Sequence, residues 1–517
     1  MLPLHLQPES HIPLYVQLRD QLRALVHSGE LRTGDRIPAS RELAGQLGVH
    51  RTTVANAYAE LESEGLIQGH VGRGTYICAI PEKQFSPAPR SNGNGNGNGH
   101  GGARWESLFA DERGDESLSR LMPDVPEGAL AFTCARPSEE FFPIEEFRRC
   151  ANAVLTKEGQ RILQLGASDG YEPLRRAVLA WFREEGLNAR PEQLLITDGA
   201  QQAIDLISKA FLRAGDAVAI ENPAYPGAIS ILAGARVRTL AVPVDAGVGR
   251  TGRVGLDVDA LENVLLQNRV KFIFVTPDFH NPTGTAMPLA ERRRLVDVAA
   301  HYQVPIIEDS IYARTRLCGP PLPPLRSLDT HNNVIQIDSF SKIAFPGLRV
   351  GWCIGPESAI ERLRLVKLAT DLHTDQFSQA TLAEFIQRGH LKRHVARMKK
   401  VHLRRLEAME VALEKHMPEG ASWTHPEGGM TIWVTLPAGF DAGDLLIHAR
   451  ERGVYFVPGR YFYLQSPQPN TLRLGFASVD EKTIARGIEI LCELLKRELK
   501  KRERGARTEW TARVALV

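Results

Sequence analysis

The sequence predicts two folded units of different classes: a small α+β unit of the helix-turn-helix type at the N-terminus and a large α/β unit after it. Three observations lead to this prediction. Apolar residues recur at helical spacing in three segments before residue 64, and strand-like runs alternate with helical runs between residues 194 and 354. The low-complexity segment Ser91–Gly102 (SNGNGNGNGHGG) separates the two patterns.

Composition is that of an ordinary globular protein, with 43% hydrophobic and 24% charged residues. At roughly 150 residues per domain, 517 residues suffice for about three domain-sized units. The formal net charge of +2 excludes a polybasic protein but not a local patch that binds nucleic acid. We expect no membrane span, because no apolar run approaches about 18 residues, and no secretory signal. Six scattered cysteines predict reduced thiols in a cytosol and no metal site.

A flexible linker is expected over residues 79–128. Alternating Asn and Gly offer no apolar surface to bury and have much backbone entropy to lose. The linker divides the chain into a unit at 10–78, a unit at 129–500 and a basic tail at 501–517. Residues 496–507 hold seven Lys or Arg against two Glu. We favour a solvated helix end there, and a tail that contacts DNA is the alternative.

The first unit contains three expected helices. The first lies within Pro13–Ser28, and Ser40 is the expected N-cap of a second, Arg41–Leu47. Gly48 begins a tight turn before a third helix. The apolar face of this third helix is formed by Val54, Tyr58 and Leu61.

The first residues of the third helix, Arg51 to Thr53 among them, are polar and do not lie on its apolar face. In a helix-turn-helix, the second helix of the motif sends such side chains to bases and phosphates. Two short strands, 66–68 and 75–78, enclose a glycine-rich tip that forms a wing. Residues 11–78 carry seven basic and seven acidic residues, so the DNA prediction rests on where the charges lie. A small helical dimerisation module is the alternative.

The sequence of residues 34–77 resembles the winged helix of the GntR family along almost its whole length. It reads GDRIPASRELAGQLGVHRTTVANAYAELESEGLIQGHVGRGTYI. The resemblance implies DNA contacts from the second helix, the start of the third helix and the wing. His50 stands where many members have Ser. The residues expected at DNA are Arg41, His50, Arg51, Thr52, Thr53, Gly72 and Arg73.

The second unit shows the strand–helix alternation of an α/β fold with a largely parallel sheet. Ligand sites in such sheets lie beyond the carboxyl ends of the strands. The expected strands are Leu194–Thr197, Ala217–Ile220, Lys271–Thr276, Pro305–Glu308, Val334–Asp338 and Val350–Ile354.

Lys342, in SFSKIAFPGLRVGW, follows a buried-type strand and has apolar neighbours. A desolvated lysine has a lowered pKa and can form a Schiff base with an aldehyde. Arg349 can clamp a phosphate with help from the Ser339 hydroxyl. The S-x-x-K spacing also occurs in penicillin-binding proteins and β-lactamases, but no KTG or SDN accompanies it here.

Other polar residues follow the neighbouring strands. Asp309 ends one strand, and its carboxylate can keep a pyridine nitrogen protonated. Asn281 and Tyr312 can hydrogen-bond a phenolic oxygen. Ala200 and Gln201 stand at the start of a helix, where backbone N–H groups suit a phosphate. Tyr225 offers a ring for stacking, and Arg473, on a late strand without an obvious partner, suits a carboxylate of a substrate or effector.

Together these motifs resemble, in order, the fold-type I pyridoxal-phosphate enzymes of the aspartate aminotransferase superfamily over most of the second unit. The resemblance implies pyridoxal 5'-phosphate as the cofactor and Lys342 as the residue that binds it covalently. It implies cofactor contacts from Asp309, Tyr312, Asn281, Tyr225, Ala200, Gln201, Ser339 and Arg349. Leu165 is a departure, because the family often has there a Tyr that reaches the partner subunit's phosphate.

The order of winged helix, linker and aminotransferase-like domain resembles the MocR subfamily of bacterial GntR-type regulators. This resemblance implies a cytoplasmic regulator that binds double-stranded operator DNA and senses pyridoxal phosphate or an amino compound. It also implies a head-to-tail homodimer with exchanged winged helices. The alternative is a functional aminotransferase that carries a winged-helix head, since every catalytic group is present in the sequence.

Overall fold

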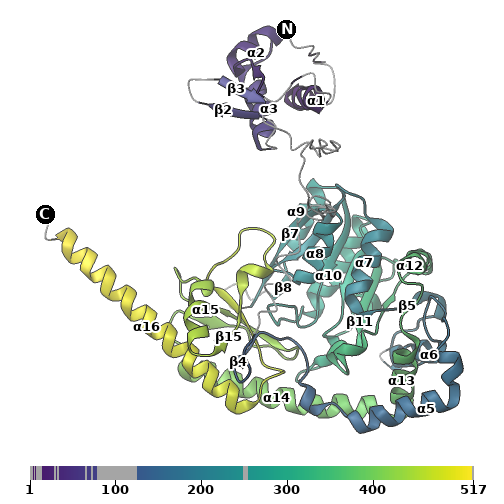
Figure 1. The fold of residues 1–517 in the computed structure, drawn as a ribbon. Helices are drawn as coiled ribbons and strands as arrows, with labels where there is room; N and C mark the ends of the chain where they lie inside the picture. Colours follow the sequence, from purple (N-terminus) through teal and green to yellow (C-terminus); the bar gives the residue numbers. More distant parts are fainter. Residues whose placement is uncertain are drawn as a thin grey trace, which may run out of the picture. The chain divides into compact units, whose positions relative to one another are not determined.

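The computed structural model describes residues 4, 6, 14–27, 31, 34–63, 67–70, 74–77, 125–184, 186–247 and 254–514. The chain divides into two compact units, Met1–Arg104 and Trp105–Val517 (Figure 1). Each is described by itself. Most of the expected linker, and the wing residues Gly72 and Arg73, lie outside the described residues.

The N-terminal unit has the expected three helices and a small sheet. The helices are α1 (Leu14–His27), α2 (Ser40–Leu47) and α3 (Arg51–Ser63), and the strands are β1 (Arg36–Ile37), β2 (Ile67–His70) and β3 (Gly74–Ile77). The sheet order is β1-β3-β2, with antiparallel pairing throughout. Leu18 of α1 packs with Val54 and Leu61 of α3, and all three are fully buried. The predicted α+β helix-turn-helix unit is confirmed.

The expected N-cap at Ser40 is wrong by one residue. Ala39 occupies the cap position with an extended backbone and no side-chain cap, and Ser40 is the first residue of α2. Gly48 ends α2 in the left-handed region at φ 64°, which a glycine adopts without strain. The tight turn between α2 and α3 therefore forms as expected.

An eight-stranded sheet forms the centre of the large unit. Its strands, in chain order, are β5 (Leu194–Thr197), β6 (Ala217–Asn222), β7 (Arg238–Asp245), β8 (Gly255–Leu256), β9 (Val270–Val275), β10 (Ile306–Asp309), β11 (Val334–Ser339) and β12 (Gly351–Ile354). The order across the sheet is β5-β12-β11-β10-β9-β6-β7-β8. The five adjacent strands β11, β10, β9, β6 and β7 pair in parallel.

The sheet is mixed, because β12 runs antiparallel to both β11 and β5, and β8 runs antiparallel to β7. Parallel strands need a crossover of about a dozen residues or more, usually with a helix. Only two short 3₁₀ turns, Phe340–Lys342 and Pro346–Leu348, lie between β11 and β12. The chain therefore turns straight back, and this turn carries Lys342 and Arg349.

Helices cover both faces of this sheet (Figure 1). They are α5 (Ile144–Ile162), α6 (Glu172–Glu184), α7 (Gly199–Phe211), α8 (Pro226–Gly234), α9 (Val258–Gln267), α10 (Leu289–His301), α11 (Leu325–Leu328), α12 (Glu357–Thr370) and α13 (Gln376–Gln387). Alternate strand residues enter different cores: Phe272 packs with residues of α7 and α12, and Ile273 packs with residues of α9 and α10. Burial on both faces explains the nearly continuous apolar runs of these strands.

A second, antiparallel sheet follows in the chain. It has the order β13-β14-β17-β16, formed by β13 (Ser422–Trp423), β14 (Thr431–Thr435), β16 (Val457–Pro458) and β17 (Thr471–Gly475). A separate pair joins β4 (Leu130–Ala131) to β15 (Val454–Tyr455). The helices are α14 (His390–His416), α15 (Ala442–Glu451) and α16 (Glu481–Val514). The basic run at 496–507 thus belongs to α16. Among the described helices, none has the length and apolar character needed to cross a membrane.

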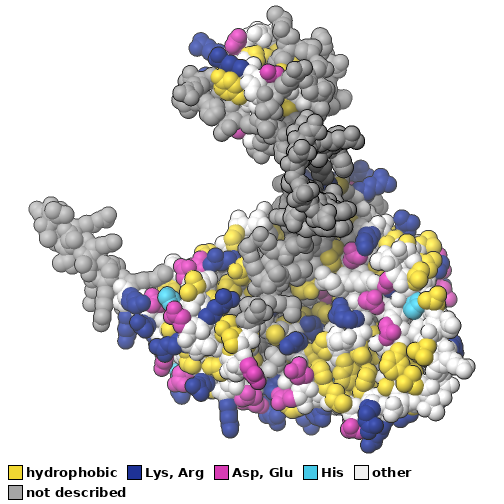
Figure 2. All heavy atoms as spheres, viewed as in Figure 1, with side chains coloured by type: hydrophobic (Ala, Val, Ile, Leu, Met, Phe, Trp, Pro, Cys, Tyr) yellow, Lys and Arg dark blue, Asp and Glu magenta, His cyan; other side chains and the backbone are white. Residues whose placement is uncertain are grey.

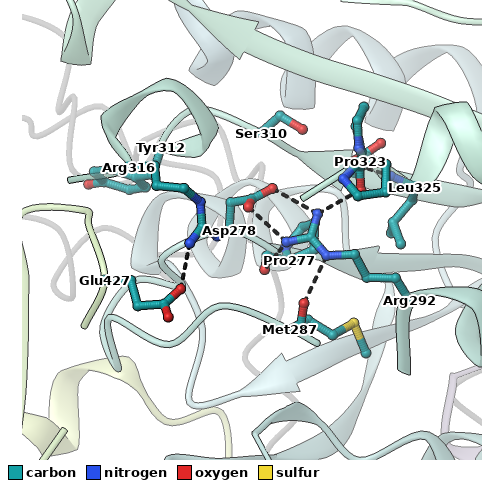
Figure 3. Close-up of polar contacts among 12 residues, drawn as sticks. Pro277, Asp278, Met287, Arg292, Ser310, Tyr312, Arg316, Pro323, Leu325 and Glu427 are labelled. Atoms are coloured by element: carbon teal, nitrogen blue, oxygen red, sulfur yellow. Dashed lines mark hydrogen bonds and ion pairs between the residues drawn. The ribbon is translucent and has the colours of Figure 1, made fainter. Parts of the chain in front are cut away.

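A buried arginine anchors the loop that carries Asn281. Arg292 of α10 is fully buried and pairs with both carboxylate oxygens of Asp278, at 2.7 and 3.1 Å. It also donates to the carbonyl oxygens of Pro277, Met287 and Pro323 (Figure 3). Because these bonds hold both ends of the segment 277–287, they position the turn at Asn281.

Candidate functional site

The large unit contains a cavity of about 920 Å³ at the carboxyl ends of β9, β10 and β11. Cavities of this size hold cofactors and small ligands in other proteins. Every residue that the sequence suggested for the cofactor and the carboxylate lines it: Ala200, Gln201, Tyr225, Asn281, Asp309, Tyr312, Ser339, Lys342, Arg349 and Arg473. The fold therefore brings together residues that are spread over most of the unit.

Lys342 ends the short 3₁₀ turn that follows β11. Its Nζ donates a hydrogen bond to the carbonyl oxygen of Ala135 at 2.7 Å. Burial lowers the pKa of Lys342 to about 8, with the charge of Arg473 acting in the same direction and that of Asp309 opposing it. About a tenth of this amine is therefore unprotonated, and nucleophilic, at pH 7, far more than for an unperturbed lysine.

Asp309 is the last residue of β10, beside Ile337 of β11. Its Oδ1 accepts a hydrogen bond from the backbone N–H of Ile311 at 3.1 Å. Burial raises the pKa of Asp309 to about 6, while the Ile311 N–H and Lys342 act against this rise. A buried carboxylate of this kind gains most from a protonated nitrogen that sits within the cavity.

The start of α7 and Arg349 meet in one corner of the cavity. Gly199 has φ 77°, and a Cβ there would lie 2.7 Å from Nη2 of Arg349. The same Nη2 donates to the carbonyl oxygen of Asp198 at 3.2 Å. No side chain caps α7, so the backbone N–H groups of its first turn are available to a ligand. Ser339 lies nearby in the lining, and its Oγ accepts from the Ser341 N–H at 2.9 Å.

Tyr225 occupies the N-cap position of α8. Its hydroxyl donates to Oε1 of Gln201 at 3.0 Å. Gly227 lies against the ring, because a Cβ there would come within 2.4 Å of Cε1 of Tyr225. The ring is held at the wall of the cavity by these two contacts.

Arg473 of β17 is buried and meets the loop of Asn281 in the cavity wall. Nη1 donates to Oδ1 of Asn281 at 3.0 Å, and Nη2 donates to the carbonyl oxygen of Thr133 at 2.6 Å. The expectation that Arg473 lacks a partner is therefore wrong, since a loop and a chain segment distant in sequence both reach it. Its Nε is buried without a hydrogen-bond partner among the described residues, and burial lowers the pKa of the guanidinium.

Asn281 and Tyr312 line the same wall. Because Oδ1 of Asn281 accepts from Arg473, the amide nitrogen is the group left to donate. Burial raises the pKa of the Tyr312 hydroxyl, so it stays a donor at neutral pH. The Nζ of Lys342 lies 5.4 Å from the centroid of the Tyr312 ring.

Sequence reasoning missed the part of the wall formed by residues 133–136, which follows β4. This strand has two residues; its pairing with β15 and the hydrogen bonds of Thr133 and Ala135 with Arg473 and Lys342 hold the segment at the cavity. A single arginine at the end of the apolar run ALAFTCAR was the one available signal. The missed lining residues with polar side chains are Thr133, Cys134, Arg136, Thr276 and Ser341.

In the N-terminal unit, α3 begins at Arg51, and Arg51 and Thr52 are exposed. His50 is exposed beside them, with Nδ1 2.8 Å from Oγ1 of Thr52, and Thr53 is half-buried. Arg41 is exposed at the start of α2. The described part of the expected DNA-contacting set is therefore largely on the surface of the unit.

Two protein-family models match the chain. Aminotransferase class I and II matches residues 138–491, and bacterial regulatory proteins, gntR family, matches residues 14–77. The crystal structure of multiple substrate aminotransferase from Thermococcus profundus has a TM-score of 0.71 and 32% identity, and the match covers 77% of this chain and 100% of that chain.

Several regulators match across both units. The HTH-type transcriptional regulator TauR of Rhodobacter capsulatus is 30% identical, over 95% of this chain and 98% of that protein. The probable rhizopine catabolism regulatory protein MocR of Rhizobium meliloti is 27% identical, over 94% of this chain and 95% of that protein.

Proposed function

This chain belongs to the aminotransferase class I and II family and joins that domain to a gntR-family domain, and we propose that it is a transcriptional regulator of the MocR type. In this proposal, the N-terminal unit binds DNA and the large unit binds pyridoxal phosphate through Lys342. The observation that carries the proposal is the cavity lined by Lys342, Asp309 and Arg349 in a chain that also exposes Arg51 at the start of α3. We expect the protein to act in the bacterial cytoplasm, where operator DNA is found.

The residues present fit pyridoxal phosphate. The Gly199 backbone leaves room for the Arg349 guanidinium beside the uncapped start of α7, which suits a phosphate. The buried Nε of Arg473 has no partner among the described residues and suits a carboxylate. Asp309 would hold a protonated ring nitrogen, Asn281 and Tyr312 would donate to a phenolic oxygen, and Tyr225 would stack on the ring.

When bound, pyridoxal phosphate supplies an aldehyde that condenses with amines and a ring that withdraws electrons. The chain's own residues prepare this chemistry. The lowered pKa of Lys342 provides an unprotonated amine, and Asp309 holds a proton at its carboxylate or at a partner nitrogen. Arg473 orients the carboxylate of an incoming amino compound.

We infer that the protein senses pyridoxal phosphate or an amino compound through the charge on Lys342. Burial lowers the pKa of Lys342, and the nearby charges of Arg473, Asp309 and Arg349 shift it further, Asp309 upward and the two arginines downward. A ligand that releases or binds the amine changes the charge of a buried cavity. If the ligand binds one conformation of the protein more tightly than another by a few kcal/mol, the equilibrium between the two conformations shifts.

DNA binding is assigned to the N-terminal unit. Arg41, His50, Arg51, Thr52 and Thr53 would contact bases and phosphates from α2, α3 and the turn between them. Gly72 and Arg73, outside the described residues, would contact DNA from the wing. The partner is double-stranded operator DNA.

The large unit exposes large apolar side chains before α6 and after α12. Leu163 and Leu165 are 75% and 76% exposed, and Leu372 is 51% exposed. Tyr171 donates its backbone N–H to Gln379, and Gly166 lies against Gln376, so the segment after Leu165 packs on α13. Figure 2 shows hydrophobic side chains gathered near α13. Such a patch is typical of a dimer face, and we propose a head-to-tail homodimer.

A functional aminotransferase is the second candidate, because the groups needed for transamination line one cavity: Lys342, Asp309 and Arg473. The exposed polar residues at the start of α3 favour the regulator over the aminotransferase as the function of this chain. Transamination makes no use of Arg51 and Thr52, whereas DNA recognition does. Absence of turnover with any amino acid and keto acid pair would remove the second candidate.

Two measurements on the purified full chain test the proposal. A visible absorbance band should be present with pyridoxal phosphate and absent in Lys342→Ala. A gel shift on the DNA upstream of its own gene should appear, and it should change when the cofactor or an amine is added. A chain that shifts none of the upstream fragments is not the proposed regulator.

A further inference from the structure

One cation of the cavity has no role in the assignments above. The described lining residues include four cationic side chains, Arg136, Lys342, Arg349 and Arg473, against one carboxylate, that of Asp309. In the proposed function, which this inference extends, Lys342 and Asp309 serve the cofactor, Arg349 its phosphate and Arg473 one carboxylate. Arg136 remains.

Arg136 lies next to the reactive lysine in the wall of the cavity. Ala135, the preceding residue, accepts the hydrogen bond from Nζ of Lys342 at 2.7 Å. Thr133, three residues earlier, accepts from Nη2 of Arg473 at 2.6 Å. The segment 133–136 therefore contacts both groups that would engage an amino acid, and Arg136 is its exposed, solvent-facing end.

The guanidinium of Arg136 forms no hydrogen bond or ion pair with the part of the chain that the structure describes. Among the other exposed arginines of the large unit, Arg148 pairs with Glu145 at 2.6 Å and Arg190 pairs with Glu357 at 2.7 Å. Arg136 differs from them in that it also lines the cavity. A planar guanidinium with five N–H donors suits a carboxylate or a sulfonate.

The rest of the lining offers few large apolar groups against which a large apolar side chain would pack. Its two aromatic residues, Tyr225 and Tyr312, are assigned to the cofactor. The other apolar lining residues are small or lie singly, such as Ala131, Pro226 and Ile311. A short side chain with an acidic end fits the remaining surface better than an aromatic one.

We propose that Arg136 binds a second acidic group of the effector, so that the effector is an α-amino acid with an acidic side chain. Its amine would reach the position of Lys342, its α-carboxylate would pair with Arg473, and its distal carboxylate or sulfonate would pair with Arg136. Arg136 is in this sense a specificity-determining residue.

The test is a titration of the cofactor-loaded full chain, read by the change in visible absorbance. The probes are aspartate, glutamate and cysteate, with asparagine and glutamine as neutral matches of the first two. In the wild type each acid should bind more tightly than its amide, by about tenfold or more, as expected for a charge-assisted pair.

Three variants distinguish a loss of ligand selectivity from a general loss of folding. In Arg136→Gln the acid-to-amide ratio should fall toward one, while the dissociation constants of the amides stay unchanged. Arg136→Lys should restore part of the ratio, because it keeps the charge. Arg148→Gln, an exposed arginine of α5 outside the cavity, should leave the ratio as in the wild type.

The proposal is overturned if the wild type does not prefer the acids, if it responds to none of the probes, or if Arg136→Gln keeps the preference. An amine with a single acidic group that binds as tightly as the diacids also contradicts it. Failure of the proposed function is distinguishable, because it would remove the visible band itself, and every Arg136 variant should keep that band.

Discussion

The side-chain amine of Lys342 donates a hydrogen bond to the backbone carbonyl oxygen of Ala135, 2.7 Å away. The bond joins the turn after β11 to a chain segment that enters the unit before α5. It keeps the amine within the cavity that Asp309 and Arg473 also line. A backbone carbonyl holds the lysine without competing as a permanent counter-ion, so the amine can be released to an aldehyde.

Asp309→Asn should weaken retention of pyridoxal phosphate by about tenfold or more, because a buried charge-assisted bond to the ring nitrogen is lost. The measurement is the dissociation constant of the cofactor, from visible absorbance after dialysis against known concentrations. Ser341→Ala, at a lining residue without a cofactor assignment, is the control. Equal retention by Asp309→Asn and the wild type would remove Asp309 from the cofactor site.

Loading of the cofactor should depend on pH through Lys342. Only the unprotonated amine attacks an aldehyde, and burial lowers the pKa of Lys342 to about 8. The loading rate should rise roughly tenfold per pH unit below that value and level off above it. Stopped-flow absorbance between about pH 6.5 and 9.5 measures this profile, since the range brackets the shifted pKa and ends below the value of about 10.4 for an unperturbed lysine.

Arg473→Gln should move that profile to higher pH, because the Arg473 charge lowers the pKa of Lys342. A profile that still rises steeply above pH 9 in the wild type would show that the amine is not desolvated. An unchanged profile in Arg473→Gln would show that the two cations do not interact.

Arg292→Met should destabilise the large unit by about 3–5 kcal/mol, because it leaves the buried Asp278 carboxylate without its cation. The midpoint of urea unfolding measures the loss. Arg294→Met, on the same helix but in a partly exposed pair with Asp259, should cost no more than about 1 kcal/mol. Similar losses for both variants would mean that Arg292 does not anchor the loop of Asn281.

Arg51→Ala should weaken binding to all DNA sequences and reduce the slope of log affinity against log salt by about one, as loss of one phosphate contact does. Fluorescence anisotropy over a range of salt concentrations gives both quantities. Arg148→Ala, in the large unit, should change neither. If Arg51→Ala binds operator DNA with the wild-type affinity and slope, α3 is not the recognition helix.

The part of the cavity that is formed by residues at the carboxyl ends of strands could be predicted from the sequence. Asn281, Asp309 and Lys342 each come shortly after a recognisable buried strand, and β9, β10 and β11 lie side by side in parallel, so these residues meet at one edge. Local apolar patterns also sufficed for α1 and α3, whose inward faces carry Leu18 and Val54.

Features that depend on distant pairing could not be predicted. Arg136 reaches the cavity because β4 pairs with β15, and two residues of strand give no pattern. The partner of Arg473 at Thr133 has the same origin. The direction of β12 depends on the short turns after β11, and the one-residue error at Ser40 reflects how weakly a sequence marks the first turn of a helix.

The affinity of the cofactor-loaded full chain for its own upstream DNA, measured by anisotropy with and without aspartate or glutamate, tests the central claim most directly. The account predicts that the amino acid changes the wild-type affinity at least about fivefold, which corresponds to a coupling free energy of about 1 kcal/mol or more. Lys342→Ala should bind the same DNA and show no response. A wild-type affinity that is independent of every amine and of pyridoxal phosphate, or a response that persists in Lys342→Ala, would contradict the account.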